Sequence, residues 1–460
     1  MTLIKSISGI RGTIGGPQGN NLTPIDLVKF TSAYAAWLKE SNPGQKLKVI
    51  VGRDARISGQ LVAHIVTGTL AASGVDVIDL GLCTTPGVEL AVASMKANGG
   101  LILTASHNPK QWNALKMLND KGEFLDAEAG DRVLQLAETN LEYPSIDEIG
   151  QISTAPDYTA DHVKAVLRLP LVQAENIRAK KYKVVVDAVN SVGGIAIPVL
   201  LRELGAEVVE LNCEPTGLFA HNPEPLPENL TEIAEAVVRE KADLGIVVDP
   251  DVDRLALVNE DGTMFGEEYT LVAVADYVLS KTPGNTVSNL SSSRALRDVT
   301  EKYGYQYSPA KVGEVNVVAE MKRTNAVIGG EGNGGIIYPE SHYGRDALVG
   351  VALFLSLLAE RNVKMTTLRA TYPSYYISKN KMDTAGIEKI EQVLASITQK
   401  YEHEKIDTRD GIKIDFPTEW VQLRRSNTEP IIRIYSESKD KESADALAKH
   451  IMDDIEAFNK

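Results

Sequence analysis

The sequence predicts an α/β protein with three similar doubly wound α/β domains and a smaller C-terminal α+β domain around a central cleft. Its 460 residues exceed what one hydrophobic core usually organises, so several domains are expected. Hydrophobic residues make up 43% of the chain, and they fall in short strand-like runs that alternate with helical patterns. The same strand–helix–strand unit recurs along the chain, which indicates repeated domains.

The first unit shows this pattern most clearly. A strand-like run from Leu47 to Val51 is followed by a helical pattern that ends at Gly74 and by a second strand from Val75 to Leu80. A similar unit begins at Val184, and a weaker one runs from Val287 to Gly304. Three related α/β domains therefore precede the tail of the chain.

The tail has a different composition. Strand patterns near Lys413 and Ile431 and a helical pattern from Ala444 predict an α+β domain there. The apolar run from Ala347 to Ala359 is too short to span a bilayer and predicts a buried helix. The expected domain limits are residues 1–152, 153–256, 257–370 and 371–460.

Charge and cysteine content narrow the functional class. A net charge of -14 and a pI near 5.1 argue against a protein that binds nucleic acid or a membrane surface. Cys83 and Cys213 each follow a strand-like run, which predicts buried structural thiols rather than a disulfide framework. The first residues lack the apolar core of a signal peptide. We expect a cytoplasmic monomer or homodimer that binds a small molecule.

The segment TASHNP contains the first candidate catalytic residue. It follows the apolar strand from Leu101 to Leu103, so Ser106 lies in a loop just beyond the carboxyl end of a strand. Open α/β sheets bind their ligands at this edge, and Asn108 with Pro109 can fix a turn that presents the hydroxyl. An ordinary polar turn explains the hexapeptide equally well.

The segment DPDVDR predicts a metal site. It follows the apolar run from Leu244 to Val248, so Asp249, Asp251 and Asp253 leave the strand end at alternate positions. Three neighbouring carboxylates repel one another, and a hard divalent cation relieves that repulsion. Because carboxylate oxygens are preferred ligands of Mg²⁺, we expect Mg²⁺ at this loop.

Three other interpretations of the DPDVDR segment compete with this metal site. An EF-hand does not fit, because Arg254 stands where the sharp turn needs glycine and a strand rather than a helix precedes the loop. A phosphatase of the haloacid dehalogenase type would use Asp249 as its nucleophile, but it would leave the Ser106 loop unexplained. A solvated acidic turn is the third alternative, and the buried-type strand before the loop disfavours it.

Two further clusters could bind a phosphorylated sugar. The segment LRRSNTEPIIR offers guanidinium groups and hydroxyls to a phosphate through Arg424, Arg425, Ser426, Asn427 and Thr428. The glycine-rich segment from Gly329 to Gly335 contains Glu331 and Asn333, whose side chains can hydrogen-bond sugar hydroxyls. Arginines in a loop are usually surface residues, but the hydroxyl–amide–hydroxyl run beside the paired arginines favours an anion site. By itself, the glycine-rich loop is weak evidence.

In this order, the four motifs resemble those of the α-D-phosphohexomutase family, and the resemblance covers essentially the whole chain. In that family four domains surround one cleft and carry, in turn, the phosphoserine, the metal, the sugar-recognition loop and the phosphate-binding loop. The resemblance implies that Ser106 is phosphorylated. It also implies an Mg²⁺ ion held by Ser106, Asp249, Asp251 and Asp253.

The resemblance implies roles for neighbouring residues as well. The segment SGIRG makes Arg11 an active-site cation, and NALK makes Lys116 the general acid/base, although Ala114 replaces the family's usual glycine. His107 would orient groups at the phosphoserine, and Arg254 would lie beside the transferring phosphate. The implied substrate-binding residues are Glu331 and Asn333 for the sugar and Arg424, Ser426, Asn427 and Thr428 for the phosphate.

The implied reaction interconverts hexose 6-phosphate and hexose 1-phosphate through the phosphoserine and a hexose bisphosphate intermediate. Many family members carry Ser and His in the sugar loop, where this chain has Asn333 and Gly335, a pattern that looks most like phosphoglucosamine mutases. Glucosamine phosphate is therefore the expected substrate, with phosphomannose or phosphoglucose as the alternative. The cations expected to make the cleft positive are Arg11, Arg53, Arg56, Lys110, Lys116, Arg254, Arg424 and Arg425.

Overall fold

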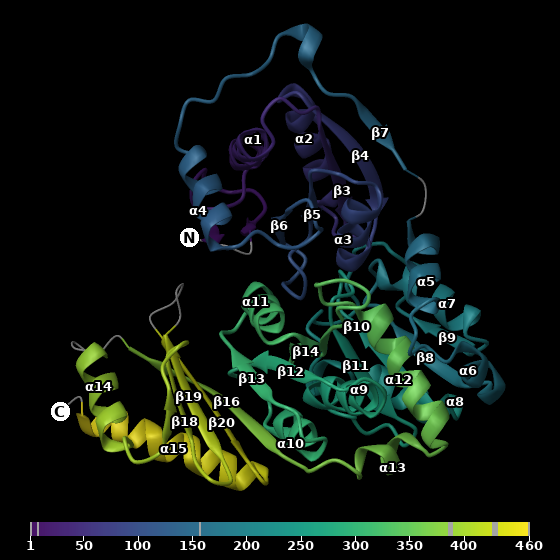
Figure 1. Cartoon of the computed structure of the whole chain (residues 1–460), viewed down its shortest axis with the longest axis vertical. Coiled ribbons are helices and arrows are strands. Elements are labelled where there is room, and N and C mark those ends of the chain that lie inside the picture. The colour runs from purple at the N-terminus through teal and green to yellow at the C-terminus, as the bar shows by residue number, and fades with distance from the viewer. Residues whose placement is uncertain (1, 7–8, 156–157, 385–389, 426–430, 459–460) are drawn as a thin grey trace.

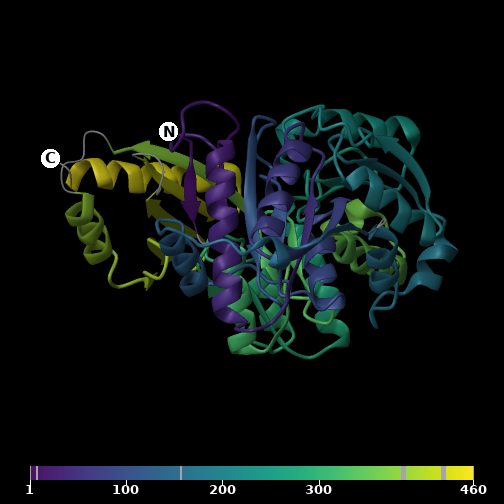
Figure 2. The ribbon, with the colours of Figure 1, turned by 90° about the horizontal axis from the view of Figure 1, so that it is seen from above.

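The computed structural model describes residues 2–6, 9–155, 158–384, 390–425 and 431–458. Within these residues the chain forms four sheets, each in a successive part of the sequence (Figure 1). Three α/β units and a fourth unit with its own sheet are present, so the expected fold class is confirmed. Seen from above, the second and fourth units lie on opposite sides of the first, and the third lies beneath it (Figure 2).

The first unit has a seven-stranded sheet in the order β1-β2-β6-β5-β3-β4-β7. Its longest helix begins at Pro24 because Thr23 and Asp26 form a capping box. Its elements are β1 (Ile4–Ser6), β2 (Gly9–Thr13), α1 (Pro24–Ser41), β3 (Leu47–Arg53), α2 (Gly59–Ala72), β4 (Val75–Leu82), α3 (Thr85–Ser94), β5 (Gly99–Leu103), β6 (Trp112–Leu118), α4 (Ala127–Leu136), the 3₁₀ turn η1 (Ile146–Glu148) and β7 (Ile152–Thr154).

The second unit has a four-stranded sheet in the order β11-β10-β8-β9. Its central strands are continuous apolar runs because helices cover both of their faces. Its elements are α5 (Thr159–Leu167), α6 (Ala174–Lys180), β8 (Lys183–Asp187), α7 (Gly193–Glu203), β9 (Glu207–Leu211), η2 (Pro227–Asn229), α8 (Thr231–Glu240), β10 (Leu244–Val248) and β11 (Leu255–Asn259).

The third unit has a four-stranded sheet in the order β13-β12-β14-β15, and the fourth has a five-stranded antiparallel sheet in the order β16-β20-β19-β18-β17. The elements of the third are α9 (Glu267–Lys281), β12 (Asn285–Asn289), α10 (Ala295–Lys302), β13 (Tyr307–Ala310), α11 (Glu314–Thr324), β14 (Ala326–Glu331), β15 (Gly335–Ile337), α12 (Ala347–Arg361) and α13 (Met365–Arg369). Those of the fourth are β16 (Tyr376–Asp383), α14 (Ile390–Lys400), β17 (Lys405–Asp407), β18 (Ile412–Asp415), β19 (Trp420–Arg425), β20 (Ile431–Ser438) and α15 (Lys441–Phe458).

Three of the sheets share one arrangement of four strands. The first strand of each set is central and pairs in parallel with the second and third, and the fourth pairs antiparallel with the third. The sets are β3 to β6, β8 to β11 and β12 to β15. The link between the third and fourth strands contains Ser106 in the first set, the three aspartates in the second and Asn333 in the third.

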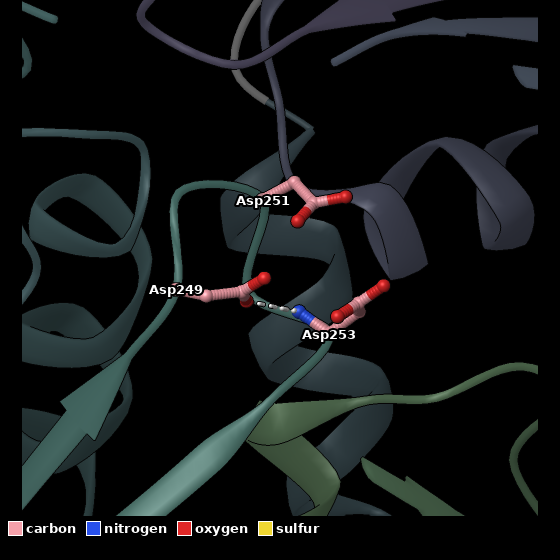
Figure 3. A group of neighbouring side chains, drawn as sticks. All are labelled: Asp249, Asp251 and Asp253. Atoms are coloured by element: carbon pink, nitrogen blue, oxygen red, sulfur yellow. Dashed lines mark hydrogen bonds between the residues drawn. The ribbon is translucent and has the colours of Figure 1, made fainter. Parts of the chain in front are cut away.

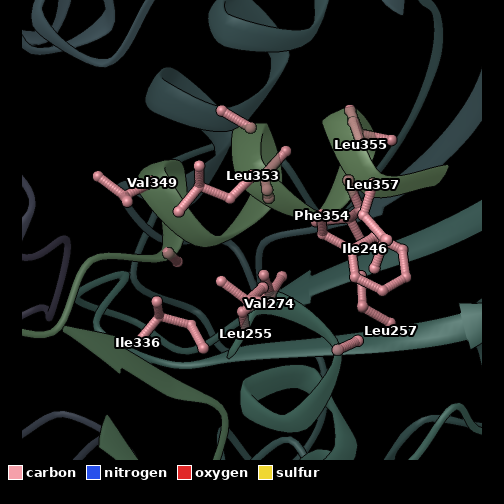
Figure 4. Packing of buried hydrophobic residues seen from close by; sticks show 14 of the residues in the cluster. Ile246, Leu255, Leu257, Val274, Ile336, Val349, Leu353, Phe354, Leu355 and Leu357 are labelled. Carbon is pink, nitrogen blue, oxygen red and sulfur yellow. The ribbon is translucent and has the colours of Figure 1, made fainter. Parts of the chain in front are cut away.

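The second and third units share one hydrophobic core. The apolar helix α12 is buried on all sides, as the sequence predicts, and packs against β10, β11 and β15 (Figure 4). Its Phe354 makes an edge-to-face contact with Phe265, with the ring centroids 5.2 Å apart. The side chain of Asp346 caps the helix by accepting from the N–H groups of Leu348 and Val349. No helix in the described part of the chain has the length and apolarity that a membrane span requires.

The expectation that both cysteines are buried is met only in part. Cys83 is buried, but Cys213 is only half-buried because it follows β9, the edge strand of its sheet. The second sheet also continues through β11 to Asn259, beyond the expected domain limit at residue 256. We propose that each domain ends where its own sheet ends, so that the second domain includes β11.

Candidate active site

Ser106 lies in the loop between β5 and β6, and its side chain contacts the second unit. The residue is 7% exposed and has φ 48°, a left-handed conformation that is uncommon outside glycine. Its hydroxyl donates to Asp249 Oδ2 at 2.6 Å and lies 3.3 Å from His107 Nδ1. The candidate nucleophile of the first unit therefore contacts the candidate metal site of the second.

A buried ion pair between Arg56 and Asp54 holds the Ser106 loop in place. Arg56 is 1% exposed; its Nε donates to Asp54 Oδ2 at 2.9 Å, and its Nη groups donate to the carbonyls of Ser106, Pro109 and Trp112. The sequence suggested Arg56 as a cleft cation. The structure shows instead that it is buried and braces the loop, because its charge is paired with Asp54.

The three aspartates follow β10 and turn their carboxyl groups toward one another (Figure 3). Asp249 Oδ1 accepts from the backbone N–H of Asp253 at 3.2 Å and of Arg254 at 3.1 Å, which closes the loop on itself. One oxygen from each carboxyl group lies within 4.8 Å of the others, so the group could hold a metal ion. Asp251 Oδ1 and Asp253 Oδ1 are buried and accept no hydrogen bond from the described residues, as expected of oxygens that face a cation site.

The first unit supplies cationic and hydroxyl partners to this loop. Lys116 Nζ donates to Asp251 Oδ2 at 2.7 Å and lies 3.7 Å from Asp253 Oδ2, and Thr85 Oγ1 donates to the same Asp251 oxygen at 2.6 Å. Burial opposes the charge on Lys116, but the two carboxylates outweigh it and raise the pKa of the ammonium. Lys116 is therefore charged.

The aspartates differ in how their charge is balanced. Burial, together with repulsion from Asp253 and Asp251, raises the pKa of Asp249 well above its usual value. Burial also opposes ionisation of Asp251, but Lys116 and the Thr85 hydroxyl outweigh it and lower its pKa. Burial and mutual repulsion thus disfavour ionisation of all three carboxyl groups together, and a divalent cation held between them would relieve that repulsion.

Three other predicted residues surround Ser106. Arg11 Nη1 donates to Asn108 Oδ1 at 3.3 Å, and Arg254 Nη1 donates to Glu224 Oε1 at 3.4 Å. Burial and the charge of Arg254 lower the pKa of His107 to about 2, so its imidazole is neutral. Arg11 and Arg254 are thus close enough to His107, the neighbour of Ser106, for their charges to lower its pKa.

The sugar-loop residues lie close to the metal loop. Gly334 O accepts from Leu255 N at 3.0 Å, so the loop after β14 is bonded to the residue that follows Arg254. Glu331 is buried and Asn333 is half-buried; Asn333 Oδ1 accepts from Gly335 N at 3.2 Å. The predicted sugar residues therefore adjoin the predicted metal residues.

The tail cluster is described only in part. Arg424 ends β19 half-buried, with its Nη1 3.4 Å from Asp410 Oδ2, and Arg425 is exposed and pairs with Glu391. Arg425 is therefore a surface ion pair in this structure rather than a free cation. Ser426, Asn427 and Thr428 lie outside the described residues.

Several residues in this site were missed by sequence reasoning. Thr85, Arg345 and Glu314 contact the aspartates or their neighbours, although they are far from DPDVDR in the sequence. The one available signal was the Arg-Asp pair at Arg345 before a long apolar helix. That pattern by itself indicates only a helix start.

The chain matches four family models in succession. They are described as phosphoglucomutase/phosphomannomutase alpha/beta/alpha domain I at residues 3–144, domain II at 160–262, domain III at 266–375 and the C-terminal domain at 362–454. The order of these matches is the order of the four sheets.

Curated relatives and solved structures agree with these matches. A phosphoglucomutase/phosphomannomutase from Thermococcus kodakarensis is 36% identical over 94% of this chain and 95% of its own length. A phosphoglucosamine/phosphogalactosamine mutase from Sulfurisphaera tokodaii is 32% identical over 97% of this chain and 98% of its own. The crystal structure of a phosphoglucomutase/phosphomannomutase family protein from Burkholderia thailandensis has a TM-score of 0.82 at 25% identity and covers 99% of this chain and 98% of its own.

The matches span nearly all of the chain and its relatives, and the resemblance drawn from the four motifs is confirmed. The chain therefore belongs to the phosphoglucomutase/phosphomannomutase family, the α-D-phosphohexomutases, and is an intramolecular phosphotransferase.

Proposed function

We propose that this protein is a phosphoglucosamine mutase that interconverts glucosamine 6-phosphate and glucosamine 1-phosphate through phosphorylated Ser106 and a bisphosphate intermediate. The observation that carries the proposal is the 2.6 Å contact between Ser106 Oγ and Asp249, which joins the nucleophile to a group that could bind a metal. The name of the Sulfurisphaera tokodaii relative and Asn333 in the sugar loop support glucosamine phosphate.

The proposed metal is Mg²⁺, held by the three aspartates together with an oxygen at Ser106. Their buried oxygens, two of them without hydrogen-bond partners among the described residues, fit a hard cation with oxygen ligands. When bound, the cation would neutralise negative charge on the phosphoryl group during transfer.

The chain's own residues would do the remaining work. As the bond between phosphorus and Ser106 Oγ breaks, a bond forms between phosphorus and the sugar hydroxyl oxygen, and the hydroxyl proton ends on Ser106 Oγ. Lys116 is the proposed carrier of that proton, and Arg11, His107 and Arg254 would stabilise the phosphate. The intermediate then turns over, and the reverse transfer of its other phosphate restores phosphorylated Ser106.

The other substrate contacts are also assigned by proposal. Glu331 and Asn333 would orient the sugar, and Arg424 with Ser426, Asn427 and Thr428 would hold the phosphate that is not reacting. The protein would act in the cytoplasm as a monomer or homodimer. Its small-molecule substrate would be the phosphosugar.

A direct test is peptide mass spectrometry of the purified protein combined with coupled assays on glucosamine, mannose and glucose phosphates. We expect a phosphoryl group on Ser106 in part of the population and fastest turnover with glucosamine phosphate. Ser106→Ala should reduce turnover to the assay background while the protein stays folded, since a loop hydroxyl contributes little to stability.

Two results would contradict the proposal. A phosphoryl adduct on Asp249, with phosphate release from the sugar, would indicate the dehalogenase-type phosphatase. Faster turnover of mannose or glucose phosphate would retain the mutase and replace the proposed substrate.

A further inference from the structure

Arg345 is a buried arginine at the junction of the second and third units. It lies just before α12, and its guanidinium contacts three carboxylates at once. Nη2 donates to Asp253 Oδ2 at 2.7 Å, Nη1 to Glu331 Oε2 at 3.0 Å and Nε to Glu314 Oε2 at 2.8 Å. One planar cation therefore uses each of its nitrogens on a different acidic residue.

The three carboxylates come from separate elements. Asp253 belongs to the metal loop after β10, Glu331 ends β14 at the sugar loop, and Glu314 begins α11. All are buried, so without a cation they would repel one another at short range. Burial opposes the charge on Arg345, but the three carboxylates outweigh it and raise its pKa well above its usual value. Arg345 is thus permanently charged.

On the metal side, Arg345 fixes the direction of one carboxylate. Asp253 Oδ2 accepts from Arg345 and lies near Lys116, whereas Oδ1 is buried and receives no hydrogen bond from any described residue. Arg345 thereby leaves Oδ1 available within the aspartate cluster. Partners that orient a metal ligand in this way also tune its affinity for the metal.

On the sugar side, Arg345 donates to Glu331, the residue that ends β14 at the sugar loop. Glu331 Oε1 accepts from Asn289 Nδ2 at 2.8 Å and from Gly313 N at 3.0 Å, so only Oε2 remains for Arg345. A shift of the sugar loop that moves Glu331 must therefore change the position of Arg345 or break its bond. Because Arg345 also donates to Asp253, a change in its position alters that hydrogen bond.

We propose that Arg345 is a positioning residue that couples the sugar-recognition loop to the metal ligand Asp253, so that phosphosugar binding and metal affinity depend on each other. The metal side of this inference stands on the aspartate cluster. The sugar side rests on the proposed function.

The first experiment measures Mn²⁺ binding to the purified protein by electron paramagnetic resonance, without any sugar. Arg345→Lys keeps the charge but cannot contact three carboxylates in one plane. We expect its Mn²⁺ affinity to fall by about 10- to 100-fold, the usual effect of losing a partner that orients a metal ligand. Arg323→Lys is the matched control, because Arg323 lies in the same unit, is exposed and, among the described residues, pairs with Glu320 alone.

The second experiment repeats the Mn²⁺ titration with saturating glucosamine 6-phosphate. In the wild-type protein and in Arg323→Lys the sugar should change the Mn²⁺ affinity, and by linkage Mn²⁺ should change the sugar affinity by the same factor. In Arg345→Lys this factor should fall toward one. A role confined to stability would lower the melting temperature and leave the factor unchanged.

Glu331→Gln tests the same link from its other end and serves if Arg345→Lys does not fold. It keeps the shape of the loop but weakens its hold on Arg345, so the sugar-dependent factor should again fall toward one. An unchanged Mn²⁺ affinity in Arg345→Lys, or an unchanged factor in either variant, would overturn the inference. If glucosamine 6-phosphate is turned over but does not affect wild-type Mn²⁺ binding, the coupling fails and the proposed function stands. If it is not turned over, the proposed substrate fails, while the sugar-free titration still decides the metal role of Arg345.

Discussion

The loop after β5 and the loop after β10 occupy equivalent places in two repeated sheets, yet they are stabilised in different ways. The Ser106 loop is held from within its own unit, because Arg56 and Asp54 lie in the link between β3 and α2 of that unit. The aspartate loop closes on its own N–H groups and contains one cation, Arg254, but the cations that donate hydrogen bonds to its carboxylates come from outside, Lys116 from the first unit and Arg345 from the third.

This difference shows that repeated strand order does not imply repeated function. A loop with a single neutral hydroxyl can be held by one buried ion pair. A loop with three buried carboxylates needs cations on several sides, and here the neighbouring units provide two of them. We therefore expect the Ser106 loop to depend on its own unit and the aspartate loop to depend on assembly of the three units.

Arg56→Ala should cause the largest loss of unfolding free energy. The change leaves Asp54 buried without its cation, and removing one partner of a buried ion pair costs about 3 to 5 kcal/mol of unfolding free energy. Urea unfolding would measure it. The control is Arg132→Ala in the same unit, whose exposed pair with Glu40 contributes at most about 1 kcal/mol. Adding Asp54→Asn should recover part of the loss, and no recovery would argue against the unpaired carboxylate as its cause.

Lys116→Met should lower the unfolding free energy as much as Arg56→Ala does, but only when metal is removed. The variant leaves Asp251 without its ammonium partner, so in EDTA we expect a loss of about 3 to 5 kcal/mol. Mg²⁺ should recover much of it, because a bound cation stabilises the folded state and replaces the missing charge. Equal losses with and without Mg²⁺ would mean that the aspartate loop does not bind the ion.

Arg424→Ala tests the fourth unit, which contributes no described side chain to the Ser106 or aspartate loops. A charge-assisted contact to phosphate is worth about 1.5 to 3 kcal/mol, so kcat/KM for the phosphosugar should fall by roughly ten-fold or more. Mn²⁺ affinity should not change. Lys400→Ala, an exposed pair with Asp454 in the same unit, is the control. Unchanged kcat/KM in Arg424→Ala would make this arginine an ordinary surface residue.

The smallest expected effect is a pH dependence at a second contact between units. His342 lies 3.2 Å from both Glu89 and Asp346, and although burial opposes its charge, these carboxylates raise its pKa to about 10. A raised folded-state pKa stabilises the protein fully below the unfolded value of 6.5, and the contribution is lost as the pH rises toward 10. The stability difference between the wild type and His342→Asn should therefore shrink from pH 6 to pH 9.5 in urea unfolding. A difference that grows with pH would contradict this sign.

The sequence by itself determined the units and the positions of the main motifs. Apolar runs such as Leu244–Val248 are buried strands because both faces of a parallel sheet are covered, and such runs are visible without a structure. The polar residues directly after these runs had to lie at a strand end. Ser106 and Asp249 could be identified for this reason.

Only the tertiary structure decided which side chains meet. Ser106 and Asp249 are separated by 143 positions and Arg345 and Asp253 by 92, and nothing in local periodicity connects them. Arg56 and Arg254 each follow an aspartate within two positions in the sequence, but the first is buried and holds the Ser106 loop through its pair with Asp54, while the second acts on His107, the neighbour of Ser106. Pairing of buried charges depends on the packing of whole units against one another, and that packing is set by the shared core rather than by any one motif.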